Sequence, residues 1–164
     1  MNKSRTELIG IYLNDHLAGA TVGTQLAHRI ACRHGEVADQ ATLQRLAGEI
    51  NADRRALLVV MSGLGVPVRH YKTTAAWLGE RAGRLKFNGQ LRTRSPLSSL
   101  EELEMLRLGV EGKAAGWRTL RELAETEPRL DRAGLDELLA RARAQADQLE
   151  ALRVRAASHL ARAE

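Results

Sequence analysis

Aromatic residues, proline and cysteine are all scarce in this chain of 164 residues. Aromatic residues make up 3% of the sequence, so a core has to be built from Leu, Ala, Ile and Val. Those side chains suit helix-on-helix packing, whereas strands favour β-branched and aromatic residues. With three prolines there are few helix breaks, and with one cysteine no disulfide can form within the chain. The composition therefore predicts an all-α protein.

Long apolar runs are missing as well. The chain has no stretch of about 18 apolar residues and no N-terminal apolar run of the signal-peptide type. Together with the low cysteine content, this predicts a cytoplasmic protein without a membrane partner. The length suits a single domain, 1–164, that is large enough to bury a core.

Apolar residues at alternating spacings of three and four predict four long helices. Short links join the first pair and the last pair, so each pair is predicted to form an antiparallel hairpin. The link between the pairs is long, and its own apolar stripe predicts a short fifth helix within it. The predicted helices span about residues 5–33, 38–64, 71–85, 96–125 and 131–162.

Polar residues interrupt the apolar stripes near the middle of the predicted bundle. His16 lies within the stripe of the first helix and Asp53 within the stripe of the second. A turn near residues 34–35 places these two side chains level with each other, so we expect them to face each other. Polar residues flanking them, or at the same depth on the other helices, are Asp15, Glu49, Glu111, Lys113, Gln145 and Gln148.

A buried charge is costly unless it is paired or bound to a metal ion, so this layer allows three interpretations. The first is a structural layer in which His16 pairs with Asp53, and Glu111 or Arg54 completes the network. The second is a site for a divalent metal ion made by His16, Asp53 and Glu111. The third is a different helix register, in which the outlying acidic and amide side chains face water.

Two stretches carry a resemblance to a known superfamily. YLNDHLAGA, from Tyr12 to Ala20, and EGKAAGW, from Glu111 to Trp117, are similar to an uncharacterised bacterial group of ferritin-like proteins. The helix lengths and the long crossover resemble that superfamily too. The resemblance implies a ferritin-like four-helix bundle, with two antiparallel hairpins and a long crossover that makes the second and third bundle helices parallel.

The metal centre of that superfamily is matched poorly by this sequence. Di-iron ferritin-like proteins take a Glu from each of two helices and a Glu-x-x-His from each of the other two. Here the second helix lacks a His after its acidic residues, and the last helix supplies the amides Gln145 and Gln148. Only Glu111 matches by residue type, and amides are poor ligands for iron. An intact di-iron centre is therefore not predicted, and the cofactor stays unassigned.

Basic residues gather in the crossover. Between Val66 and Pro96 there are seven Lys and Arg residues and one acid, a net charge of +6 in a chain whose total is +5. An aromatic side chain among arginines can stack on nucleic-acid bases, so this segment is a candidate polyanion or nucleic-acid surface. The alternative is a solvated helix whose Trp covers one end of the bundle. The candidate residues are Arg69, Lys72, Trp77, Arg81, Arg84 and Lys86.

No catalytic residue is predicted. Cys32 has His28 one turn before it, but a catalytic Cys–His pair also needs a positioned base and an oxyanion site, and nothing nearby supplies them.

The sequence as a whole favours a binding or structural module over an enzyme. Four apolar residues lie off the main stripe of the helix predicted at 96–125, and they are candidates to face a partner such as a second copy of the chain. A metal-binding or redox protein and a polyanion-binding protein are the alternatives. The off-stripe residues are Leu97, Leu100, Met105 and Leu108.

Overall fold

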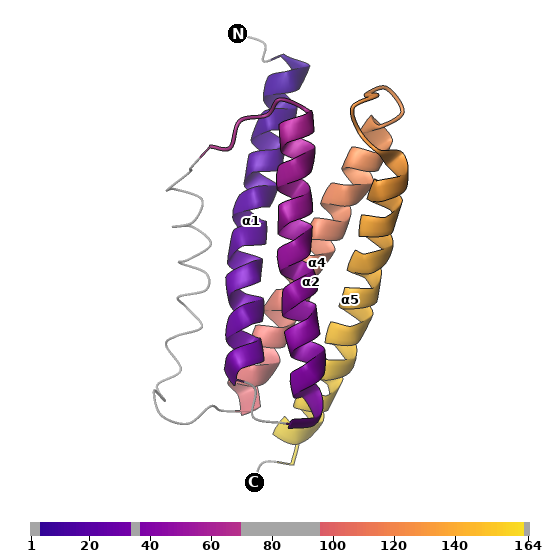
Figure 1. Cartoon of the computed structure of the whole chain (residues 1–164). Helices are drawn as coiled ribbons and strands as arrows, with labels where there is room; N and C mark the ends of the chain where they lie inside the picture. The colour runs from indigo at the N-terminus through magenta and orange to yellow at the C-terminus, as the bar shows by residue number, and fades with distance from the viewer. Residues whose placement is uncertain (1–3, 34–36, 70–95, 163–164) are drawn as a thin grey trace.

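In the described part of the chain, four long α helices lie side by side in a bundle in the computed structural model (Figure 1). The structure describes residues 4–33, 37–69 and 96–162, and in these ranges it contains no strand. The predicted helix at 71–85 lies outside the described residues. In the labels of Figure 1 the helices are α1 (Arg5–Arg33), α2 (Val37–Gly63), α4 (Pro96–Leu123) and α5 (Arg132–Leu160). The all-α prediction is confirmed for the described residues, and the four bounds agree with the predicted ones within two residues at each end.

Polar side chains fix the starts of two helices. Ser4 and Glu7 form a reciprocal capping box: the Ser4 N–H donates to Glu7 Oε2 at 2.8 Å, and the Glu7 N–H donates to Ser4 Oγ at 3.2 Å. At the start of α5, the carboxylate of Asp131 accepts from the Ala133 N–H at 3.1 Å. Each bond satisfies a backbone donor that has no partner within its own helix.

A glycine ends α2. Gly65 has a φ of 69°, in the left-handed region that a residue with a Cβ rarely adopts. The Val66 N–H then donates to the Met61 carbonyl at 2.9 Å, and the Gly65 N–H donates to the Ser62 carbonyl at 3.0 Å. This is the Schellman arrangement, and it turns the buried side chain of Val66 back onto the core.

The chain that leaves α2 is then held against α1 by Asn14, a buried residue. The Asn14 amide donates to the Pro67 carbonyl at 3.1 Å, and its oxygen accepts from the Arg69 N–H at 2.7 Å. One side chain thus binds both backbone groups that flank Val68. The first residues of the crossover are therefore fixed beside the N-terminal half of α1.

Interhelical side-chain contacts give the helix directions. Arg45 bonds to Gln148 while Asp53 bonds to Arg141, so residue numbers rise along α2 as they fall along α5. The same holds for α4 and α5, which are joined by an ion pair between Arg107 and Glu150 and by further pairs along their length. Since both α2 and α4 are antiparallel to α5, they run in the same direction, as Figure 1 also shows.

The helices pack as two hairpins. The broadest interfaces are within the hairpins, between α4 and α5 and between α1 and α2. Between the hairpins, α1 packs on α4 over a substantial length, whereas α2 and α5 approach each other closely at few places. In the described residues, the backbones of α2 and α4 do not come close, so these two helices lie diagonally across the bundle.

The core is divided into two apolar clusters, one toward each end of the bundle. Along α2 the first cluster ends at Ile50 and the second begins at Leu57, so the division falls at Asp53. Along α4 it falls between Val110 and Ala114. A polar layer therefore crosses the interior between the two clusters.

Candidate functional site

Asp53 is the centre of the polar layer, and its side chain is 1% exposed. The Lys113 ammonium donates to Asp53 Oδ2, and the Arg141 guanidinium donates to Oδ1 through both Nε, at 2.7 Å, and Nη2. Lys113 comes from α4 and Arg141 from α5. One carboxylate of the first hairpin is therefore bound by two cations of the second hairpin.

Gln145 joins the members of the layer to one another. It is fully buried, and its amide nitrogen donates to Asp53 Oδ2 at 3.2 Å and to Glu49 Oε2 at 3.1 Å. Its oxygen accepts from the Lys113 ammonium. Both ends of the amide are thus satisfied, as a buried amide requires.

The layer reaches the surface between α2 and α5. Glu49 accepts from Arg45 at 2.8 Å, and Arg45 also donates to the oxygen of Gln148. The backbones of α2 and α5 come close at few positions, and here long polar side chains join the two helices. The network therefore connects the two hairpins from the core to solvent.

Burial competes with charge at Lys113, whose side chain is 15% exposed. Desolvation lowers the pKa of the ammonium below its ordinary value, and the charge and hydrogen bond of Asp53 act in the opposite direction. The nearby Arg141 lowers the Lys113 pKa further. Asp53 is thus the main group that opposes the effect of burial on the Lys113 pKa, and the charge of Glu49 acts in the same direction.

His16 lies elsewhere, between α1 and α4. Its ring is packed so closely on Gly116 that a Cβ at that glycine would be 3.0 Å from the imidazole. Tyr12 meets the ring edge to face with centroids 4.5 Å apart, and the Tyr12 hydroxyl donates to Thr119 Oγ1 at 3.0 Å. Desolvation lowers the pKa of His16 below 6.5, and the neighbouring Asp15 raises it in part.

The predicted pairing of His16 with Asp53 is therefore wrong. The two residues are not hydrogen-bonded to each other, and the partners of Asp53 are the three described above. Arg54, the other predicted partner, instead donates to Thr21 of α1 at 3.1 Å. An apolar stripe is wide enough to contact two neighbouring helices, and His16 is on the side of its stripe that meets α4.

Two further residues assigned to the layer lie at the surface. Glu111 has a side chain that is 47% exposed and pairs with Arg107 on its own helix. Asp15 is exposed as well. In the described ranges no group of three or more His, Cys, Asp and Glu side chains is arranged to hold a metal ion. His16, Asp53 and Glu111 therefore do not form the cluster that the metal hypothesis expected.

Sequence reasoning missed Arg141 and gave Lys113 no role. Lys113 left a signal, because it stands three residues after Val110 and four before Trp117, where the alternating spacing of that helix calls for an apolar residue. Arg141 left none. The side chain of Arg141 is 39% exposed, and a long apolar stem lets its head group reach a buried carboxylate from an outer position of the helix.

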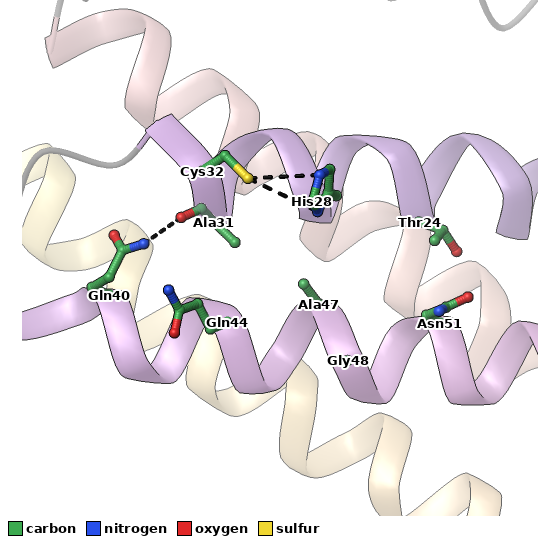
Figure 2. A pocket seen from close by; sticks show the side chains of 9 residues that line it. All are labelled: Thr24, His28, Ala31, Cys32, Gln40, Gln44, Ala47, Gly48 and Asn51. Atoms are coloured by element: carbon green, nitrogen blue, oxygen red, sulfur yellow. Dashed lines mark hydrogen bonds between the residues drawn. The ribbon is translucent and has the colours of Figure 1, made fainter.

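A second feature is an open groove of about 470 Å³ on the α1–α2 hairpin (Figure 2). Figure 2 shows the sulfur of Cys32 directed toward the ring of His28. The Cys32 sulfur lies 3.6 Å from Nε2 and 3.9 Å from Nδ1 of that ring. At one end, the Gln40 amide donates to the Ala31 carbonyl at 2.5 Å. The groove is lined by Thr24, His28, Ala31, Cys32, Gln40, Gln44, Ala47, Gly48 and Asn51.

Most of the predicted polyanion surface lies outside the described residues. That applies to Lys72, Trp77, Arg81, Arg84 and Lys86. Arg69 is described and exposed, and its backbone N–H is bound by Asn14. Over the described residues, none of the helices combines the length and apolar character needed to span a bilayer.

Comparison of the chain with protein-family models, with curated proteins and with solved structures finds no match in any of the three. The ferritin-like resemblance therefore stays a prediction from the sequence.

Proposed function

We propose that this chain is a ferritin-like helical-bundle module that binds a partner and is not an enzyme. We propose further that its polar layer holds the two hairpins together and has no catalytic or metal-binding role. The observation that carries the proposal is the set of partners around Asp53. Both carboxylate oxygens already accept hydrogen bonds from Lys113, Arg141 and Gln145. A metal ion at this carboxylate would have to displace two cations that it would also repel.

The lock has a physical reason to be polar. Apolar packing alone tolerates small shifts of one hairpin along the other. A buried carboxylate that needs a Lys and an Arg at the same depth tolerates such shifts poorly, because a shift would separate it from its partners. The parallel directions of α2 and α4 and the long crossover support a ferritin-like topology for the proposed module. In that scheme the layer occupies the interior position where metal-dependent relatives would carry their ligands.

Metal analysis of the purified protein tests the proposal. We expect no metal ion whose presence depends on Asp53, and we expect Asp53→Asn to lower the stability of the bundle. The matched comparison is Glu111→Gln, which removes an exposed carboxylate on α4. Stoichiometric metal that is present in the wild type and lost in Asp53→Asn would overturn the proposal.

The binding partner proposed for the module is a second copy of the chain, seated on the outer side of α4. Leu108 is 62% exposed and Leu97 is 37% exposed, and Leu100 and Met105 are half-buried. Light scattering behind size-exclusion chromatography tests this partner. We expect a dimer that dissociates in Leu108→Glu, while a monomer at high concentration would contradict it.

Polyanion binding is the second candidate, favoured by the net charge of +6 between Val66 and Pro96. Neutralised phosphates release counterions, so binding to DNA or RNA should weaken steeply with salt. Replacing Arg81, Arg84 and Lys86 by Glu should abolish that binding. Equal affinity in the wild type and the variant would exclude this candidate.

A further inference from the structure

Opposite the core, α4 carries a second row of residues at alternating spacings of four and three. Each residue of the row is partly or fully exposed, and within the described part of the chain α4 packs on no helix other than α1 and α5. A row with this spacing is the seam along which a further helix can pack. The row consists of Glu101, Met105, Leu108, Gly112, Ala115 and Thr119.

The large and small residues of this row lie symmetrically about one point. Met105 and Leu108 precede residue 110, and Ala115 and Gly112 follow it at the same distances along the chain. Leu108 is 62% exposed, whereas a Cβ at Gly112 would meet no neighbouring atom within 4 Å. In an antiparallel pair of α4 helices with a two-fold axis near residue 110, each large side chain would therefore lie level with a small residue of the other copy.

Two charged residues fit the same axis. Glu101 and Arg118 stand on either side of residue 110 at nearly equal distances along the chain, and neither side chain has an ion-pair partner within the described residues. Glu111, the acidic residue nearest the axis, is already paired with Arg107 on its own helix at 3.8 Å. The axis that matches large residues to small ones thus also brings each Glu101 near Arg118 of the other copy.

We propose that two copies of this chain join through antiparallel α4 helices, with the two-fold axis near residue 110. This arrangement rests on the proposed function, in which a second copy is the binding partner, and it specifies the contacts of that partner. A parallel pair would place Glu101 beside Glu101 and Leu108 beside Leu108, so that like charges would face each other. The antiparallel direction instead joins acid to base and large side chains to small ones.

Charge reversal in the full chain tests the arrangement, with the dissociation constant of the dimer measured by light scattering over a series of concentrations. Arg118→Glu and Glu101→Arg should each weaken the dimer by at least about tenfold, because each places like charges together at two symmetric positions. The double variant restores opposite charges in exchanged places. Its dissociation constant should therefore return to within about threefold of the wild-type value.

Arg143→Glu is the matched control, since it makes the same charge change at an exposed position on α5 and should leave the dissociation constant unchanged. Gly112→Leu should weaken the dimer, because the new side chain fills the place of Leu108 of the other copy while it has open space within its own. Circular dichroism of each variant verifies that the helices remain formed.

The outcomes separate this arrangement from the proposed function. A double variant that dimerises no better than the two single variants would overturn the arrangement, and so would a dimer that Gly112→Leu does not weaken. If Leu108→Glu dissociates the dimer while the charge variants do not, the antiparallel arrangement fails and the proposed partner stands. A wild-type monomer at high concentration would overturn both.

Discussion

Lys113 of α4 donates a hydrogen bond to Asp53 of α2 across the diagonal of the bundle, between two helices whose described backbones do not touch. The side chains of the pair are 15% and 1% exposed. Arg141 and Gln145 of α5 bind the same carboxylate. Through this one group, the first hairpin is tied to both helices of the second.

Asp53→Asn should destabilise the protein strongly. Removing one member of a buried ion pair leaves the others without a countercharge, at a cost of about 3–5 kcal/mol. Chemical denaturation should show this loss in the free energy of unfolding. Asp15→Asn is the matched control, because Asp15 is exposed and its replacement should change stability by less than about 0.5 kcal/mol. Equal effects of the two substitutions would be incompatible with a lock at Asp53.

Replacement of Gly116 by Ala should destabilise the protein, whereas the same replacement at Gly112, one turn earlier on α4, should not. A Cβ at Gly116 would be 3.0 Å from two ring atoms of His16, so Gly116→Ala should cost about 1–3 kcal/mol through overpacking. Gly112 on the same helix has open space where a Cβ would lie, and Gly112→Ala should stabilise by about 0.5–1 kcal/mol. In a His16→Ala background the penalty at Gly116 should disappear. Thermal unfolding of these variants measures all of the effects, and a stabilising Gly116→Ala in the wild type would contradict the close packing.

His16 should make the bundle sensitive to acid. Burial lowers the pKa of His16 in the folded protein below 6.5, so folding favours the neutral ring. The stability that this provides is complete above the unfolded value and is lost as pH falls from about 6.5 through the folded pKa. His16→Gln should therefore flatten the acid limb of a plot of unfolding free energy against pH. Parallel curves for wild type and variant would show that the pKa of His16 does not change on folding.

Gly65 should be the glycine of the α2 terminus that tolerates no side chain. Its φ of 69° is strained for any residue with a Cβ, so Gly65→Ala should cost about 1–2 kcal/mol. Gly63 is two residues earlier, inside the helix, with open space around it and an ordinary φ. Gly63→Ala should be neutral or stabilising in the same thermal measurement. The reverse order would mean that the turn at Gly65 is not the end of α2.

The fold could be predicted largely from the pattern of apolar residues, and the depth of the polar layer from the interruption at Asp53. The partners of Asp53 were harder to predict. A helical stripe gives the depth of a residue but not which of two neighbouring helices it meets, so the stripe alone pairs His16 with the wrong neighbour. Arg141 sits outside the stripe, and the reach of its long side chain leaves no mark in the periodicity.

A double-mutant cycle on Asp53 and Lys113 tests the central claim most directly. The free energies of unfolding of the wild type, Asp53→Asn, Lys113→Met and the double variant give the coupling between the two side chains. If the layer locks the hairpins, each single substitution leaves a buried group unsatisfied, and the double variant should be more stable than the sum predicts by at least about 1 kcal/mol. Effects that add within about 0.5 kcal/mol would contradict the lock.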